Sequence, residues 1–126
     1  MLEKLRYYRL SDNEKKAILE KLRIFFKEYD IELVIVFGSF VELYSFRDID
    51  IAIYSKSLDL EDIFKLSAIL ELDIGYPIDI VPLDQIPPYF RLYILSKGVV
   101  LYEKRSGIYE YLLKKSLDEL ILTQKS

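Results

Sequence analysis

The chain has 126 residues, of which 52% are hydrophobic and 31% are charged, and its formal net charge is -3. This is the composition of one folded domain spanning residues 1–126, and the negative charge argues against nucleic acid as a partner. Cysteine and histidine are both missing, which excludes disulfides, thiolate metal sites and histidine-based catalysis. No run approaches the roughly 20 apolar residues of a membrane span, and residues 1–6 lack a signal-peptide core, so we expect a cytoplasmic protein without membrane association.

The first half of the chain predicts a helix followed by two strands. Residues 11–14 form a capping-box pattern, which predicts a helix from there to about Tyr29. Apolar residues at helical spacing form its inward face: Ile18, Leu22, Phe25 and Tyr29. A buried strand is expected over residues 32–37, then a turn and short helix over 38–44, and a second strand over 48–54.

The second half continues the alternation of helices and strands. A helix is predicted from a cap at Asp59 to about Leu72, and its inward face is expected to hold Ile63, Phe64, Ser67 and Leu70. After a break at residues 75–77, a short strand surrounds Asp79; a helix over 87–97 and a strand over 99–102 follow. This order predicts an α+β fold in which strands and helices alternate.

The last segment predicts an amphipathic helix. Its apolar stripe follows helical spacing, and it consists of Tyr109, Leu112, Leu113, Ser116, Leu117, Leu120 and Ile121. On the other side, Lys114 and Asp118, and Lys115 and Glu119, are spaced to form charge pairs. The stripe favours a helix that packs on its own domain. A terminal helix is also a natural contact for a partner protein or for a second copy of the chain.

Two aspartates share one face of the second predicted strand. Ile49, Ile51 and Ile53 alternate with polar positions, so a strand turns the isoleucines to one side and both Asp48 and Asp50 to the other. Like charges on one face repel each other, and aspartate is a poor strand former. A solvated strand face explains such a pair without any function, whereas a divalent cation explains why the costly pair is there.

Other residues support the interpretation as a metal and phosphate site. Asp79 interrupts a later β-branched run and supplies a third carboxylate from a neighbouring strand. Mg²⁺ prefers such oxygen ligands, and three aspartates suffice for two ions. Gly38 permits a tight turn and close backbone approach, while Ser39 offers a hydroxyl and an N–H group to an anion.

Together these residues resemble a known family. Gly38 and Ser39, followed by Asp48 and Asp50 and then by Asp79, are similar to the nucleotidyltransferase superfamily related to DNA polymerase β, in its minimal nucleotidyltransferase branch. The resemblance implies a small mixed β-sheet flanked by helices, with a helix at the C-terminus.

A narrower resemblance comes from the later segments. Residues 78–84 and 94–103 are similar to the C-terminal half of MntA-type antitoxins, which pair with HEPN-domain toxins. With the earlier motif, the similarity spans roughly residues 30–105, which is most of the chain.

The resemblance implies a role for each matching residue. Asp48, Asp50 and Asp79 are expected to hold Mg²⁺, with two ions in all, and Asp79 to activate the attacking hydroxyl. Gly38 and Ser39 are expected to hold the triphosphate of ATP. The implied reaction transfers AMP to a hydroxyl on a HEPN toxin, with a tyrosine as the implied acceptor, so that the protein acts as an antitoxin.

The loop after Gly38 and Ser39 departs from the family pattern. Residues 40–47 lack a second glycine and carry an acid, Glu42, and Arg47 is the only cation among them. The alternative is therefore a catalytically weak or inactive antitoxin that neutralises its partner by binding alone. Transfer to a small molecule is a third possibility within the superfamily, although the sequence is too short for the additional acceptor-binding domain of such enzymes.

Overall fold

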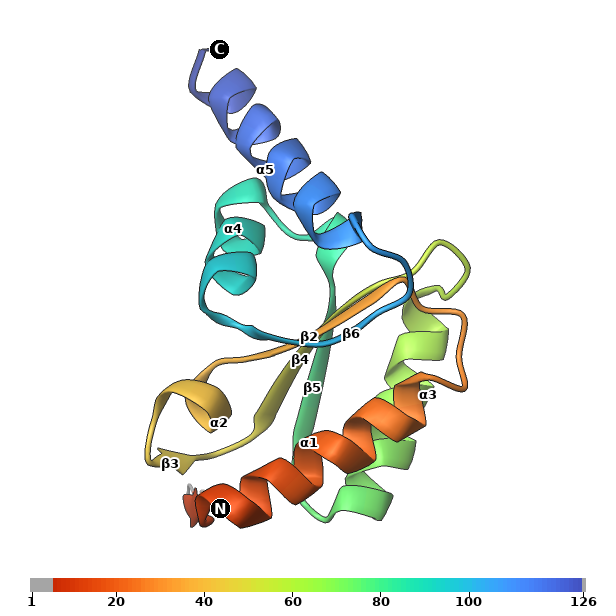
Figure 1. Ribbon diagram of the computed structural model, residues 1–126, viewed down its shortest axis with the longest axis vertical. Coiled ribbons are helices and arrows are strands. Elements are labelled where there is room, and N and C mark those ends of the chain that lie inside the picture. Colours follow the sequence, from red (N-terminus) through yellow and green to blue (C-terminus); the bar gives the residue numbers. More distant parts are fainter. Residues whose placement is uncertain (1–5, 126) are drawn as a thin grey trace, which may run out of the picture.

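The computed structural model describes residues 6–125 and centres on a four-stranded sheet (Figure 1). The strand order is β5-β4-β2-β6, in which β2 pairs antiparallel with β4 and β6, and β4 pairs parallel with β5. The mixed sheet implied by the family resemblance is thus confirmed. The four strands are β2 (Leu33–Phe37), β4 (Ile49–Tyr54), β5 (Ile78–Pro82) and β6 (Val99–Glu103).

Five α-helices and a small second sheet complete the described part of the chain. The second sheet pairs β1 (Tyr8–Arg9) antiparallel with β3 (Ser45–Phe46), and a 3-10 helix, η1, covers Leu83–Gln85. The segment before residue 6, where no signal-peptide core was expected, lies outside the described residues. The α-helices are α1 (Asp12–Phe26), α2 (Ser39–Glu42), α3 (Leu60–Ile74), α4 (Pro88–Lys97) and α5 (Ile108–Lys125).

Local sequence signals determine where the helices α1 and α3 begin and where α3 ends. Ser11 caps α1: its hydroxyl accepts from the N–H of Glu14 at 3.1 Å, and the Glu14 carboxylate accepts from the N–H of Ser11 at 3.0 Å. Asp59 and Asp62 form the same reciprocal pair at the start of α3. Gly75 ends α3 with a φ of 87°, a left-handed conformation that glycine adopts without strain.

Helices cover the two faces of the sheet in pairs. Helices α1 and α3 lie on one face, and α4 and α5 on the other (Figure 1). The first pair packs on alternate strand residues such as Val36 and Ile51, while the second pair packs on the residues between them, such as Ile35 and Ala52. The period of two along each strand therefore gives the sheet two separate apolar cores.

A buried arginine joins α5 to the second core. Arg91 is 4% exposed, and its guanidinium donates to the carbonyl oxygens of Leu83 and Ile86. It also donates to the Ser116 hydroxyl at 3.2 Å and to Glu119 Oε2 at 3.1 Å. These bonds satisfy a charge that is costly to bury, and they anchor α5 at Ser116 and Glu119.

The inward face of α3 differs from the prediction at one position. Ile63, Leu66 and Leu70 are buried, and Ser67 donates to the carbonyl oxygen of Ile78, but Phe64 is 78% exposed. The expectation that Phe64 faces inward is wrong. At about 100° per residue, an inward arc centred on Leu66 and Leu70 turns Phe64 toward solvent.

Helix α5 divides into a packed half and an exposed half. Leu112 and Ser116 are buried, whereas Leu117 and Ile121 are 45% and 50% exposed, and the end of the helix extends away from the sheet (Figure 1). Packing on the domain is thus confirmed for the first half only. Glu119, expected to pair with Lys115, binds Arg91. Within the described residues, none of the helices is both long and apolar enough to cross a membrane.

Candidate active site

Two of the predicted site residues meet on adjacent strands. Asp50 on β4 is in register with Asp79 on β5, just as Ile49 is in register with Ile78. Residues in register share a face of the sheet, so both aspartates lie on the α4 side, while Ile49 is buried on the α1 side. Asp48 precedes the first residue of β4. The predicted separation of isoleucines and aspartates between the two faces is confirmed for β4.

Negative charge is poorly compensated at Asp50. Burial raises the pKa of this carboxyl to about 7, and the neighbouring carboxylates of Asp48 and Asp79 add to the rise. The side chain is half-buried, so water solvates it only in part. A nearby cation would favour the ionised form and reverse the rise.

The turn at Gly38 closes directly against Asp50. Strand β2 ends at Phe37, which is in register with Asp50, and Gly38 then turns with a φ of 79°. A Cβ atom at Gly38 would lie 2.3 Å from Asp50 Oδ2, closer than any side chain allows. Glycine is therefore required both by the backbone angle and by the approach of the carboxylate.

Ser39 and Asp48 line the same hollow on the surface. The hollow has a volume of about 260 Å³, and Arg47 and Tyr7 also line it. The structure thus brings the predicted phosphate-binding serine beside the first predicted metal-binding aspartate. It adds Arg47, a cation to which the sequence assigned no role, in a position to interact with an anion held at Ser39.

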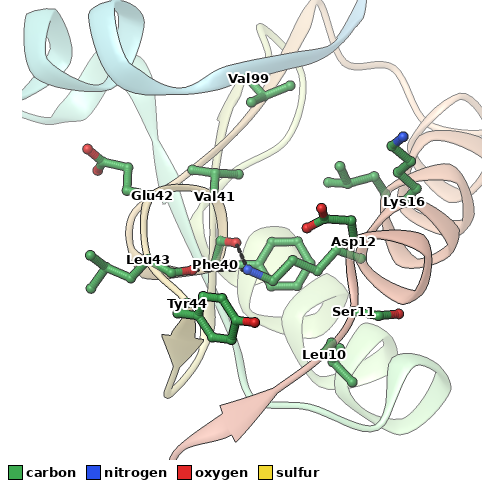
Figure 2. A pocket seen from close by; sticks show the side chains of 12 residues that line it. Leu10, Ser11, Asp12, Lys16, Phe40, Val41, Glu42, Leu43, Tyr44 and Val99 are labelled. Carbon is green, nitrogen blue, oxygen red and sulfur yellow. Dashed lines mark hydrogen bonds between the residues drawn. The ribbon is translucent and has the colours of Figure 1, made fainter.

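Lys15 of α1 holds the loop that carries this hollow. Its ammonium donates to the carbonyl oxygens of Phe40 at 2.8 Å and Leu43 at 3.1 Å, at the C-terminal end of α2. A groove of about 690 Å³ lies between α1 and this loop, and Phe40, Leu43 and Tyr44 line its loop side (Figure 2). None of the five predicted site residues lines this groove. Sequence reasoning missed Lys15 because 25 residues separate it from Phe40.

One tyrosine connects α4 to the loop beside the aspartates. Tyr93 donates its hydroxyl proton to Glu42 Oε2 at 2.6 Å. This hydrogen bond is the main cause of a raised pKa of Tyr93, and the charge of Asp50 contributes to it. Tyr93 and Glu42 therefore lie near the predicted site, although the sequence did not distinguish Tyr93 from the other ten tyrosines.

The chemical type of the ligand atoms in this site, carboxylate oxygens, suits a hard divalent cation. Asp48 and Asp50 supply carboxylate oxygens, which Mg²⁺ prefers, and the raised pKa of Asp50 marks negative charge that a cation would balance. Among the described residues, no three acidic side chains converge closely enough to hold one ion. This agrees with the usual binding of Mg²⁺, by one or two carboxylates completed by water and phosphate.

Several solved structures share this fold. A chain from the complex of a tri-AMPylated Shewanella oneidensis HEPN toxin with an MNT antitoxin aligns with a TM-score of 0.74 and 19% identity, over 88% of this chain and 90% of that one. A toxin-antitoxin structure with AMP-PNP gives a TM-score of 0.69 and 21% identity, over 92% and 91% of the two chains. The toxin-antitoxin MntA-HepT gives a TM-score of 0.68 and 20% identity, over 91% of each.

Sequence comparison gives the family. No curated protein shows significant sequence similarity to the chain. A family model described as "Polymerase beta, Nucleotidyltransferase" matches residues 20–107, a range that includes Gly38, the three aspartates and Tyr93. Because the match covers more than half of the 126 residues, the chain belongs to the polymerase beta nucleotidyltransferase family.

Proposed function

We propose that this protein is an Mg²⁺-dependent nucleotidyltransferase that moves AMP from ATP to a tyrosine hydroxyl of a HEPN toxin, and so acts as an antitoxin. The register of Asp50 with Asp79, beneath the turn at Gly38, is the observation that carries the proposal. It supports a site in which carboxylates and an anion-binding turn face the same space. Membership of the nucleotidyltransferase family supports the reaction class.

Each residue of the site has a distinct task in this proposal. Asp48 and Asp50 would hold Mg²⁺, which, when bound, offsets the charge of the triphosphate and of the leaving pyrophosphate. Ser39 would bind a phosphate oxygen through its hydroxyl and N–H, and Arg47, which lines the same hollow, would offset the charge of the phosphates. The turn at Gly38 keeps a side chain from filling the space beside Asp50.

The proposed transfer needs only ATP, the acceptor hydroxyl and a group that takes up the hydroxyl proton. The acceptor oxygen forms a bond to the α-phosphorus of ATP, and the bond from that phosphorus to the bridging oxygen breaks. Pyrophosphate leaves with the bonding electrons. The hydroxyl proton goes to Asp79, an exposed carboxylate that lies beside the cluster and is open to an acceptor from outside.

The structural neighbours support the choice of acceptor. One of them is an MNT antitoxin bound to an AMPylated HEPN toxin, and another was solved with AMP-PNP. We extend the same chemistry to this chain because its fold matches over about nine-tenths of each molecule. Tyrosine is proposed as the acceptor on the family resemblance.

Intact mass spectrometry tests the proposal. The protein is incubated with ATP, MgCl₂ and the HEPN toxin from its own genome, and we expect the toxin to gain the mass of one or more AMP groups. Asp48→Asn should reduce the rate at least about 100-fold, as expected when charge stabilisation in a transition state is lost. The matched control Asp118→Asn removes an exposed carboxylate on α5 and should transfer normally. Normal transfer by Asp48→Asn would refute the proposal.

One observation favours a second candidate, an antitoxin that works by binding alone. Glu42 places an acid on the phosphate loop, and its carboxylate accepts a hydrogen bond from the Tyr93 hydroxyl. This candidate predicts that Asp48→Asn still protects cells from the toxin and that no AMP appears on the toxin. The enzyme proposal predicts that this variant loses protection, so a growth assay separates the two.

A further inference from the structure

A second groove reaches the candidate active site from the side of α3. It has a volume of about 470 Å³ and runs between α3 and strand β5. Leu60, Phe64 and Ala68 lie four residues apart along α3 and form one wall, and Leu60 and Phe64 are 58% and 78% exposed. This wall exposes apolar surface that is costly to leave in water.

The other wall is an edge strand. Strand β5 is the outermost strand in the order β5-β4-β2-β6. On its outer side, the N–H of Ile78 donates to Glu71 Oε1 and its carbonyl oxygen accepts from Ser67 Oγ, both at 2.9 Å. The two-residue period of a strand turns the N–H and C=O of Ile80 to this same side, next to the groove. Such an edge pairs with an extended chain, as in peptide recognition by added strands.

The surroundings of the groove are acidic. Helix α3 and its cap contain one lysine, Lys65, which pairs with Glu61 at 3.4 Å. The same segment contains five carboxylates, Asp59, Glu61, Asp62, Glu71 and Asp73, of which Glu71 lines the groove together with Asp79 of β5. An occupant with lysine or arginine beside its apolar residues would complement this charge.

One residue, Asp79, belongs both to this groove and to the candidate active site. Asp79 lines the groove and is also in register with Asp50 of the carboxylate cluster. A segment that pairs with the edge of β5 therefore passes the carboxylate to which we assign the hydroxyl proton. The side chains of Ile78 and Ile80 point to the opposite face of the sheet from Asp79. The apolar side chains of a bound segment would therefore contact one face of the sheet, while its reacting hydroxyl would lie on the other face.

We propose that this groove binds the acceptor, as an extended segment of the partner protein with apolar and basic residues around a tyrosine. The inference rests on the proposed function, since it assigns the place where that function receives its second substrate. The backbone of the segment bonds to the edge of β5 at Ile80, and its apolar side chains contact Phe64. Its tyrosine hydroxyl reaches Asp79, gives its proton to that carboxylate and forms the bond to the α-phosphorus as pyrophosphate leaves.

Peptide display on the intact protein tests this proposal. A phage library of random eight-residue peptides is selected on the immobilised full chain. We expect enrichment of peptides in which apolar residues alternate, with a tyrosine and at least one lysine or arginine. Synthetic copies of the selected peptides should bind more weakly as NaCl is raised from about 0.05 to 0.5 M. With ATP and MgCl₂ they should gain AMP on the tyrosine, detected by mass.

Variants of exposed residues locate the binding without disturbing the fold. Phe64→Ser removes the apolar wall and Ala68→Trp fills the groove, and each should weaken peptide binding at least about tenfold. Leu122→Ser is the matched control, because Leu122 is 67% exposed on the distant helix α5. ATP binding, measured by calorimetry in parallel, should be the same in all of these proteins.

The outcomes separate this inference from the proposed function. Absence of enrichment, or peptides that bind the two groove variants as tightly as the wild type, would overturn the inference while leaving ATP binding intact. Peptide binding at the groove without any binding of ATP would instead remove the nucleotidyltransferase proposal, and with it the role of the groove as an acceptor site. A wild-type dimer that Phe64→Ser converts to a monomer, seen by sedimentation, would assign the groove to a second copy and also overturn the inference.

Discussion

The two faces of the four-stranded sheet are built from the same strands and differ in what covers them. Along β4, Ile49, Ile51 and Ile53 face α1 and α3 and are at most 1% exposed. Asp50 and Ala52 face the opposite side, where Ala52 joins the core with α4 and α5 but Asp50 remains half-buried. One face therefore contributes stability along its whole length, while the other gives up part of its apolar packing to the carboxylate cluster.

The difference predicts that substitutions on the two faces separate stability from nucleotide binding. Leu70 of α3 is fully buried in the core of the α1 and α3 face. We expect Leu70→Ala to lower the free energy of unfolding by about 3 kcal/mol, because it leaves a cavity in a closed core. Urea unfolding measures this loss. Calorimetry at a temperature where the variant is folded should show unchanged ATP binding, and a weakened ATP affinity would contradict the division between the faces.

A change at the boundary of the site should affect both properties. Gly38→Ala places a methyl group 2.3 Å from Asp50 Oδ2 at a φ of 79°, so the turn or the carboxylate must move. We expect a loss of about 2 kcal/mol in stability and at least a tenfold loss in ATP affinity.

Gly75→Ala is the matched control for this prediction. Gly75 has a φ of 87°, but nothing lies within 4 Å of the position of its Cβ. This variant should lose about 1 kcal/mol from backbone strain alone and bind ATP normally. If both alanine variants bind ATP equally well, the contact between Gly38 and Asp50 has no bearing on the site.

The features of the fold that could be predicted from the sequence are determined by residues close to one another in the chain. The capping boxes at Ser11 and Asp59 each act within four residues, and the start of each helix followed from them. The alternation of isoleucine and aspartate around Asp50 predicted which residues face the core, because a strand has a fixed period of two. A tight turn at Gly38 was also predicted, and the structure has it, with the Asp50 carboxylate where a side chain would lie; the approach of this turn to a bound phosphate stays a prediction.

The parts that were missed depend on contacts between distant segments. Lys15 bonds to carbonyl groups 25 and 28 residues away, and Tyr93 bonds to Glu42 across 51 residues. The pairing of β1 with β3 also escaped prediction, since two strands of two residues carry almost no periodic signal. Phe64 was placed inward from its apolar character, yet it forms a wall of the groove beside β5.

Substitution of Asp50 has the smallest expected effect, and it should raise the stability of the protein, whereas the other substitutions lower it. Burial, with the carboxylates of Asp48 and Asp79, raises the pKa of Asp50 to about 7. Because the folded state then holds a proton that the unfolded state releases near pH 4, stability falls as the pH rises from about 4 to 7 and stays low above that range. A rise of this size corresponds to ~4 kcal/mol at a fully buried site, and solvent screening of the half-buried side chain reduces it to about 1 kcal/mol.

Asp50→Asn should therefore stabilise the protein by about 1 kcal/mol at pH 8 in EDTA, and the gain should vanish at about pH 3, below the pKa of this carboxyl in both the folded and the unfolded state. Thermal or urea unfolding at the two pH values measures it. MgCl₂ with ATP should reverse the ranking, since ligands that bind only the folded wild type stabilise it by mass action. A variant less stable than the wild type at pH 8 in EDTA would show that Asp50 contributes to the fold, and the α4 face would then resemble the α1 face in using every strand residue for stability.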